Sequence, residues 1–377
     1  MVNFDNSATT FPKPQAVRRA VDTAIAKYGG NPGRSGHSLS MAVSQQIFKV
    51  RNQAAEMFGA QVQNVAFTPN CTFALNMAIK GIMQFGGHII ISGYEHNASA
   101  RPVYALSRDR GVEYDICRIY EDTDKTIAEA EKLIRKDTKC ICVTAASNVT
   151  GRILPYKEFA ALAKKHGLVF ILDGAQACGT LDIKMSDGIN FLCTSGHKGL
   201  YGPTGTGLLI SDGEYRLSTI IEGGTGATSN ELAQTPFLPE QLESGTLNTV
   251  GIIGLGEGLK FVKRKTPGGI FAHEDSLCRQ FTEGVKKIPG IKFFDENVTK
   301  VPIRGFNIGQ INSAEFAAGL NKKGFGLRGG LQCAAVAHNT LGTINQGVVR
   351  FAPGIFNTSS QVEMLVKAVK QCAKELS

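Results

Sequence analysis

The sequence contains no apolar run long enough to cross a membrane. Its longest runs of hydrophobic residues, such as Leu168–Leu172, are far shorter than the roughly 20 residues that a spanning helix needs. The amino-terminal stretch MVNFDNSATTFPKP also lacks the basic residues and the apolar core of a secretory signal. We therefore expect a cytoplasmic protein that does not associate with a membrane.

The nine cysteines lack the spacing of a disulfide framework or a zinc ribbon. No C-x-x-C occurs, and the number is odd in a chain of 377 residues, so we expect reduced thiols and no metal site. Cys140 and Cys142 alternate in KCICVTAASN. This spacing predicts that both face the same side of a strand and are buried.

Two nucleotide-binding motifs are also missing. No G-x-G-x-x-G follows an early strand, and the segment GLGEGLK at Gly254 begins a predicted helix outside the strand pattern. The segment GPTGTG has no lysine that would contact phosphates, as a P-loop requires. These absences argue against an NAD-dependent dehydrogenase and against a P-loop enzyme.

The basic residues are in excess but are not clustered. Forty-one lysines and arginines against thirty-two acidic residues give a formal charge of +9, and Lys263–Lys265 is the one basic run. Such a thin distribution favours anionic small molecules or an acidic partner over nucleic acid.

What the sequence does contain is an alternation of helical stretches with short apolar runs that end in small polar residues. This rhythm predicts an α/β fold with a mainly parallel sheet. The predicted strands are 139–148, 168–176, 190–198 and 205–211, and helices over 126–136 and 155–166 supply the crossovers.

The pattern changes after about Gly256, where helices alternate with shorter strands. Because the chain is too long for one ordinary core, we expect a large domain over residues 15–255. Residues 1–14 and 256–377 then form a smaller α+β domain. No internal repeat occurs.

Two charged residues lie where parallel strands are expected to end. Asp173 follows five consecutive apolar residues, and Lys198 follows the next predicted strand among glycines. By itself Asp173 would cap a helix or pair with an arginine, and Lys198 would be a solvated lysine. Together with a phosphate cradle they suit pyridoxal phosphate, which needs a Schiff-base lysine and a carboxylate at its ring nitrogen.

Two segments could form the phosphate cradle. One is Asn70–Thr72, at the start of a predicted helix, where free N–H groups favour an anion. The other comprises Ser195 and His197, directly before Lys198.

The chain as a whole resembles the fold-type I pyridoxal-phosphate enzymes of the class V aminotransferase family, and within it the cysteine desulfurases. The resemblance rests on eight motifs in order: DNSATT, EHNA, SNVTGRILP, LDGAQA, TSGHKGLYGPTGTG, ESGTLNT, LRGGLQCAAVAH and VRFAPGIFNT. It implies a large domain with a mainly parallel seven-stranded sheet and a small α+β domain. SGHK-x-x-GPTG with DGAQ upstream is the most specific combination.

The resemblance implies a role for each matching residue. Lys198 would form the Schiff base, Asp173 would bind the pyridine nitrogen, Gln176 the phenolate oxygen, and His96 would stack on the ring and serve as a general acid or base. The other implied cofactor-binding residues are Cys71, Thr72, Ser195 and His197 at the phosphate, Asn148 beside the ring, and Thr246 from a second subunit of a homodimer.

The resemblance also implies the substrate and the nucleophile. Arg350 would form a bidentate pair with the carboxylate of L-cysteine, with Arg328 and Asn148 beside it. Cys333 lies five residues after Arg328 on a glycine-flanked loop. It would take the substrate sulfur as a persulfide, because neighbouring positive charge favours the thiolate. The loop is short, so a sulfur-acceptor protein would have to approach the pocket.

The sequence departs from the family pattern at two places. Gln332 stands next to Cys333 where the family often has histidine, which could alter how the cysteine is deprotonated or how the persulfide is passed on. Asn70 and Cys71 stand where glycine or threonine is common. This second change affects only a backbone contact with phosphate.

Several alternatives stay open at this point. A selenocysteine lyase, a cysteine sulfinate lyase and a class V aminotransferase share the fold and differ in their use of Cys333. A noncatalytic sulfur-relay scaffold belongs to a different class, which the joint presence of Lys198, Asp173 and Cys333 disfavours.

Overall fold

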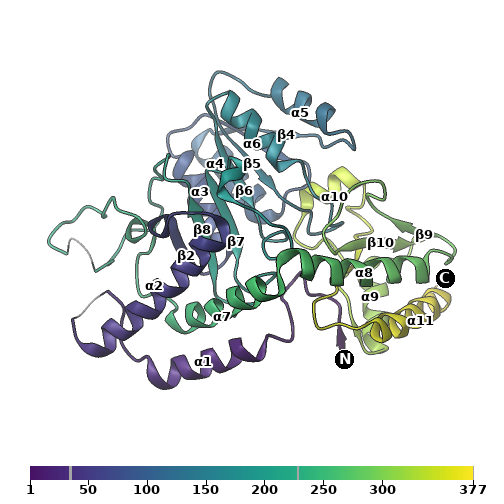
Figure 1. Cartoon of the computed structure of the whole chain (residues 1–377). Helices are drawn as coiled ribbons and strands as arrows, with labels where there is room; N and C mark the ends of the chain where they lie inside the picture. The colour runs from purple at the N-terminus through teal and green to yellow at the C-terminus, as the bar shows by residue number, and fades with distance from the viewer. Residues whose placement is uncertain (34–35, 227–228, 377) are drawn as a thin grey trace.

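A mixed β-sheet forms the centre of the large domain. The structure, a computed structural model, describes residues 1–33, 36–226 and 229–376, and Figure 1 shows how the elements are arranged. Within these residues seven strands pair in the order β2-β8-β7-β6-β5-β3-β4. Their bounds are Val65–Thr68 (β2), His88–Ser92 (β3), Glu113–Cys117 (β4), Thr138–Thr144 (β5), Val169–Asp173 (β6), Phe191–Ser195 (β7) and Gly207–Ser211 (β8).

The strand directions confirm the predicted α/β fold with a mainly parallel sheet. β8 runs antiparallel to β2 and to β7, and the other neighbouring pairs are parallel. β8 reverses direction because the loop 196–206, rather than a crossover helix, joins it to β7. This loop contains the residues that follow β7, including Lys198.

Helices cover both faces of the sheet (Figure 1). α2, α6 and α7 share one apolar cluster with the sheet, and α3 and α4 share the other. Ile141 and Val143 of β5 face the first cluster, while Cys140 and Cys142 face the second and are fully buried, as predicted. The bounds are Ser38–Phe58 (α2), Cys71–Ile82 (α3), Asn97–Arg110 (α4), Tyr156–Lys165 (α6) and Thr249–Lys265 (α7), with α1 (Gln15–Lys27) along α7 and α5 (Thr123–Lys132) beside α6.

A second core lies to the right in Figure 1. In the described residues, β9, β10 and β12 form an antiparallel sheet in the order β12-β10-β9, and β1 pairs with β11. Phe4 from the amino terminus packs into this core. The assignment of residues 1–14 to a small domain stays a prediction. The bounds are Val2–Asn3 (β1), Ile291–Phe293 (β9), Arg304–Ile308 (β10), Phe325–Gly326 (β11), Val349–Phe351 (β12), Pro267–Val285 (α8), Ser313–Lys322 (α9), Ala335–Leu341 (α10) and Ser359–Leu376 (α11).

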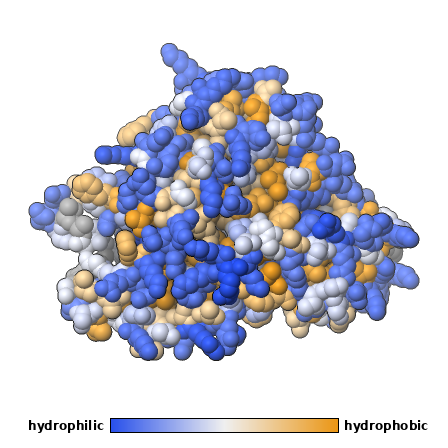
Figure 2. Space-filling model, viewed as in Figure 1, coloured by the Kyte–Doolittle hydropathy of each residue, from blue (hydrophilic) through white to orange (hydrophobic). Residues whose placement is uncertain are grey.

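The face of the molecule seen in Figure 2 is mostly polar. Figure 2 shows hydrophilic side chains over most of the visible face, with apolar residues in small groups. Among the helices of the described residues, none combines the length and the apolar character that crossing a bilayer requires.

Candidate active site

Asp173 and Lys198 lie at the carboxyl edge of two neighbouring strands. Asp173 is the last residue of β6, pairs in register with Cys193 of β7, and is 3% exposed. Lys198 comes three residues after the end of β7. Because β6 and β7 are parallel, the sheet brings the carboxylate and the amine to the same edge, as the sequence predicted.

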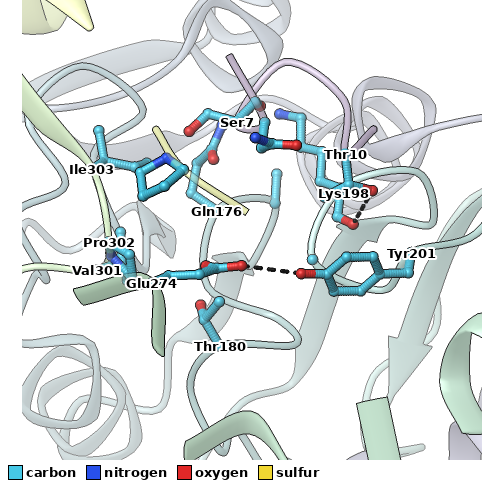
Figure 3. Close-up of a pocket in the computed structure, with 14 residues that line it drawn as sticks. Ser7, Thr10, Gln176, Thr180, Lys198, Tyr201, Glu274, Val301, Pro302 and Ile303 are labelled. Atoms are coloured by element: carbon cyan, nitrogen blue, oxygen red, sulfur yellow. Dashed lines mark hydrogen bonds between the residues drawn. The ribbon is translucent and has the colours of Figure 1, made fainter. Parts of the chain in front are cut away.

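The surroundings of Lys198 favour the uncharged amine. Burial lowers the pKa of Lys198, and the charges of Arg350 and Arg328 act in the same direction, against those of Asp173 and Cys71. A deprotonated amine is the form that attacks a carbonyl carbon. Figure 3 shows Lys198 beside Thr10, next to a cavity of about 40 Å³ that Gln176 and Ser7 also line.

The partner of Asp173 is a thiol rather than an arginine. Oδ1 of Asp173 accepts the backbone N–H of Ala175 at 2.9 Å and the Sγ–H of Cys71 at 3.3 Å. Burial and the nearby carboxylate raise the pKa of Cys71 well above its ordinary value, so it stays a thiol. Its side chain is therefore committed to Asp173, and a contact with phosphate would come from its backbone.

Two orphaned polar atoms lie at the carboxyl end of β7, one on its last residue and one two residues further on. Within the described residues, the buried Ser195 Oγ and His197 Nδ1 have no hydrogen-bond partner. Ser195 pairs with Gly207 of β8, and a Cβ at Gly207 would lie 2.7 Å from the backbone of Asn70, which caps α3. Ser195 and the start of α3 therefore lie close together, and exposed Thr72 is the second residue of that helix.

This arrangement fits the phosphate end of pyridoxal phosphate. An anion there would satisfy the orphaned atoms of Ser195 and His197 and face the free N–H groups of a helix terminus. The two candidate cradles of the sequence thus form one. The donor set agrees with a phosphate, and Asp173 and Lys198 are the residue types that the other two contacts of the cofactor would need.

His96 is held in one orientation by the helix that it caps. Its Nδ1 accepts the backbone N–H of Ala98 at 3.0 Å at the start of α4, so the neutral ring carries its proton on Nε2. Burial lowers the pKa of His96 to about 4, against the opposing charge of Asp173. Above that pH the ring is neutral and presents an Nε2–H donor.

Gln176 is tied to the amino-terminal segment. Its Nε2 donates to the carbonyl of Ser7 at 3.2 Å. Both residues line the cavity that Figure 3 shows. One amide hydrogen remains to meet an oxygen of a bound ring. The DNSATT motif therefore contributes to the site by orienting this amide.

Arg350 is a buried cation with an acidic partner that the sequence analysis missed. It is 1% exposed; it donates to Asp5 Oδ1 at 2.6 Å and to the carbonyl of Asn148 at 2.8 Å, and its Nε is an orphan within the described residues. Burial lowers its pKa, which Asp5 opposes. Asp5 precedes Arg350 by 345 positions, so only its place in the DNSATT motif could have indicated it.

Cys333 is the exposed thiol among the cysteines of the described residues; the other eight are buried. Its Sγ lies 3.9 Å from Nη2 of Arg328. Cys333 and Gln332 both have positive φ angles, +57° and +41°. Backbone contacts hold this loop, because Asn97 donates to the carbonyl of Cys333 at 2.7 Å and Asn148 to that of Gln332 at 2.8 Å.

Thr246 lies apart from this cluster. It is exposed, and its Oγ1 accepts from Asn31 at 3.4 Å. Its neighbours Gly245 and Leu247 line a different groove, of about 480 Å³. The charges that act on Lys198 come from Asp173, Cys71, Arg328 and Arg350, whereas Thr246 has no place there within this subunit. No group of metal-binding side chains occurs in the part of the chain that the structure describes.

Comparison with known families identifies the class of protein. The model of the class-V aminotransferase family matches residues 2–365, and the chain belongs to this family. Its members depend on pyridoxal phosphate, in agreement with the fit described above.

Individual relatives are similar over their whole length. A protein of Pyrococcus abyssi described as a probable cysteine desulfurase is 30% identical over 387 aligned residues, which cover 100% of this chain and 95% of the relative. The apo structure of a cysteine desulfurase from Thermococcus onnurineus matches with a TM-score of 0.92 and 28% identity, covering 100% and 95% of the two chains. The cysteine desulfurase CsdA of Escherichia coli, in an S-sulfonic acid form, matches with a TM-score of 0.88 and 25% identity, covering 100% and 95%.

Proposed function

We propose that this chain is a pyridoxal-phosphate-dependent cysteine desulfurase. It converts L-cysteine to L-alanine and leaves the sulfur as a persulfide on Cys333. The observation that carries this proposal is the exposed Cys333 thiol beside Arg328, on a fixed loop that Asn148 joins to buried Arg350. The relatives described as cysteine desulfurases support it.

The residues around Lys198 would hold the cofactor. Ser195, His197, Thr72 and the backbone of Cys71 would bind the phosphate, and Lys198 would attach covalently. Asp173 would meet the ring nitrogen, Gln176 the phenolate oxygen, His96 the ring face, and Asn148 its edge. The bound cofactor supplies a sink for the electron pair of the Cα–H bond.

The substrate would be oriented by its carboxylate. Arg350 is held in place by Asp5 and Asn148, and its Nε–H, which has no partner among the described residues, is left to donate to an anion. Arg328 lies on the neighbouring segment, where its carbonyl accepts from the backbone of Arg350 at 2.8 Å. The two guanidinium groups would direct the substrate side chain toward Cys333.

The chain's own groups then move protons and sulfur. The amine of Lys198 takes the Cα proton, which its lowered pKa permits. The Cys333 thiolate attacks the substrate sulfur, so that an S–S bond forms, the C–S bond breaks and its electron pair goes to Cβ. His96 Nε2–H is a donor that can deliver the one proton that converts Cβ into the methyl group of alanine.

A Cys333→Ala variant tests the proposal against the alternatives. Alanine production from L-cysteine should fall by several orders of magnitude, because loss of a catalytic nucleophile can cost about a millionfold in kcat, while borohydride still fixes the cofactor on Lys198. The control is Cys372→Ala, at a buried cysteine of the small domain. Unchanged desulfuration in Cys333→Ala would contradict the proposal. If the variant kept activity on selenocysteine or cysteine sulfinate alone, a selenocysteine lyase or a cysteine sulfinate lyase would be favoured. If the protein consumed a keto acid, an aminotransferase would be favoured.

The partners of this enzyme would be a second copy of the chain and a sulfur acceptor in the cytoplasm. Thr246 is exposed and would complete the phosphate site of the other subunit. Mixing Lys198→Ala with Thr246→Val subunits tests this, because one site of the mixed dimer then holds an intact Lys198 and an intact Thr246 from opposite subunits. Recovery of activity on mixing is expected, and two inactive parents that stay inactive when mixed would contradict it.

A further inference from the structure

The amino-terminal segment Thr9–Lys13 converges on one backbone carbonyl in the active site. Among the described residues, the carbonyl oxygen of His197 receives Lys13 Nζ at 2.6 Å, and the Thr9 hydroxyl, the Thr10 N–H and the Thr10 hydroxyl at 3.2 Å each. The Thr10 hydroxyl also lies 3.1 Å from the carbonyl of Lys198. Figure 3 shows this last contact.

More donors surround this carbonyl oxygen than it can accept at full strength. A carbonyl oxygen has two lone pairs, yet four donor groups surround this one, and the ammonium of Lys13 is the shortest contact. Lys13 Nζ also lies 2.7 Å from the hydroxyl of Thr10, which is itself 6% exposed. The ammonium of Lys13 therefore donates to two oxygens, the hydroxyl of Thr10 and the carbonyl of His197. Because the donor is charged, its bond to the carbonyl is the strongest of the four.

The peptide group between His197 and Lys198, whose carbonyl accepts these bonds, joins two of the site's functional residues. The imidazole of His197 and the amine of Lys198 project from adjacent residues, so the position of the carbonyl between them sets where both side chains begin. His197 Nδ1 is orphaned and buried, so nothing else among the described residues orients that nitrogen.

Lys13 also acts on His197 electrostatically. Burial lowers the pKa of His197 to about 4, and the charges of Lys198 and Lys13 act in the same direction. Burial lowers the pKa of Lys13 itself to about 8, so at neutral pH most molecules carry the charged form. The contact with the carbonyl thus persists under the conditions in which the site works.

We propose that Lys13 is a positioning residue for the cofactor site. Its ammonium, with the hydroxyls of Thr9 and Thr10, fixes the carbonyl of His197 and so aims the imidazole and the amine that follow. The inference rests on the proposed cofactor roles of His197 and Lys198.

The test measures the affinity of the apo protein for pyridoxal phosphate by absorbance titration. Lys13→Met should weaken binding by about tenfold, the usual effect of losing a charge-assisted hydrogen bond, and Lys13→Arg should restore most of it. Lys27→Met is the matched control, since Lys27 is an exposed lysine of α1 whose removal should leave the affinity unchanged. Lys13→Gln replaces Lys13→Met if the latter does not fold.

A double-mutant cycle separates positioning from a general loss of stability. If Lys13 acts through the 197–198 peptide, its substitution should cost less affinity in a His197→Gln background than in the parent, because only the amine of Lys198 is then left for that peptide to position. Equal loss in both backgrounds, parent-like affinity of Lys13→Met, or failure of Lys13→Arg to restore binding would each overturn the inference. Failure of the parent chain itself to bind pyridoxal phosphate would instead overturn the proposed function.

Discussion

At the scale of single residues, the side chain of Gln332 points away from the thiol next to it. Gln332 is 4% exposed, and its Nε2 donates to the carbonyl of Val348 at 2.5 Å and to that of Arg328 at 3.4 Å. The sequence left open whether this departure from histidine changes how Cys333 is deprotonated. The structure gives Gln332 a different task, which is to brace a loop whose two central residues have positive φ angles.

Gln332→Ala should therefore affect stability more than thiol chemistry. Losing the buried amide leaves the carbonyl of Val348 without this donor and should lower the free energy of unfolding by about 1–3 kcal/mol, measured by urea denaturation. The pH profile of Cys333 alkylation should keep its shape. Gln371→Ala, at an exposed position of α11, should change stability by less than about 0.5 kcal/mol. A displaced alkylation profile in Gln332→Ala would show that the amide does act on the thiol.

At the scale of elements, the loops after β6 and β7 touch through a pair of glycines. A Cβ at Gly179, where φ is +94°, would lie 2.0 Å from the carbonyl oxygen of Gly199, and a Cβ at Gly199 would lie 2.3 Å from that of Cys178. Gly199 follows Lys198 directly. The close approach therefore fixes Lys198 relative to the loop that follows Asp173.

Gly179→Ala should displace the loop that carries Lys198. We expect a loss of stability beyond the roughly 1–2 kcal/mol that a left-handed backbone costs alanine, together with weaker cofactor binding in an absorbance titration. Gly167→Ala is the matched control, because Gly167 has a φ of +65° but no atom within 4 Å of its Cβ. If the two variants bound the cofactor equally well, the glycine contact would have no part in placing Lys198.

The elements show which parts of the fold a sequence can predict. β6 and β7 were predicted because buried parallel strands leave continuous apolar runs that end in polar residues. α7 was predicted to begin at Gly254 but begins at Thr249. The prediction began too late because the glycines of this segment lower helix propensity. The helix nevertheless forms: Asn248 caps it, and Gly254 lies so close to Pro203 that a Cβ would be 2.7 Å away. Such a packing requirement has no local signature.

At the scale of the whole molecule, the site joins segments that are far apart in the chain. The proximity of Lys198 and Asp173 could be predicted because they lie at or just after the carboxyl ends of two neighbouring strands of one sheet. Asp5 with Arg350, and Lys13 with His197, were not, since these contacts join the amino terminus to distant segments and only the tertiary fold shows them. The part played by Thr246 depends on a second subunit and stays a prediction, as does the domain boundary near residue 255.

A buried carboxyl also links α8 of the second core to the loop after Lys198. Glu274 accepts from the Tyr201 hydroxyl at 3.0 Å, and both line the cavity beside Lys198 (Figure 3). Burial raises the pKa of Glu274 to about 8, against the opposing hydrogen bonds from Tyr201 and the backbone of Ile355. The folded protein therefore holds a proton that the unfolded chain, with its ordinary pKa of about 4.3, releases.

This difference predicts how stability depends on pH. The contribution of Glu274 is fully present below the unfolded pKa, declines as the pH rises above it and is lost once the pH passes about 8. Glu274→Gln keeps an acceptor for Tyr201 but has no proton to lose, so its free energy of unfolding should fall less than that of the parent between about pH 5 and pH 8. Urea denaturation at several pH values measures this slope, with Glu283→Gln, on the same helix, as the control. Parallel pH profiles for the parent and Glu274→Gln would mean that Glu274 is already ionised in the folded protein. In that case the contact between the second core and the Lys198 loop would involve a buried negative charge instead of a neutral acid.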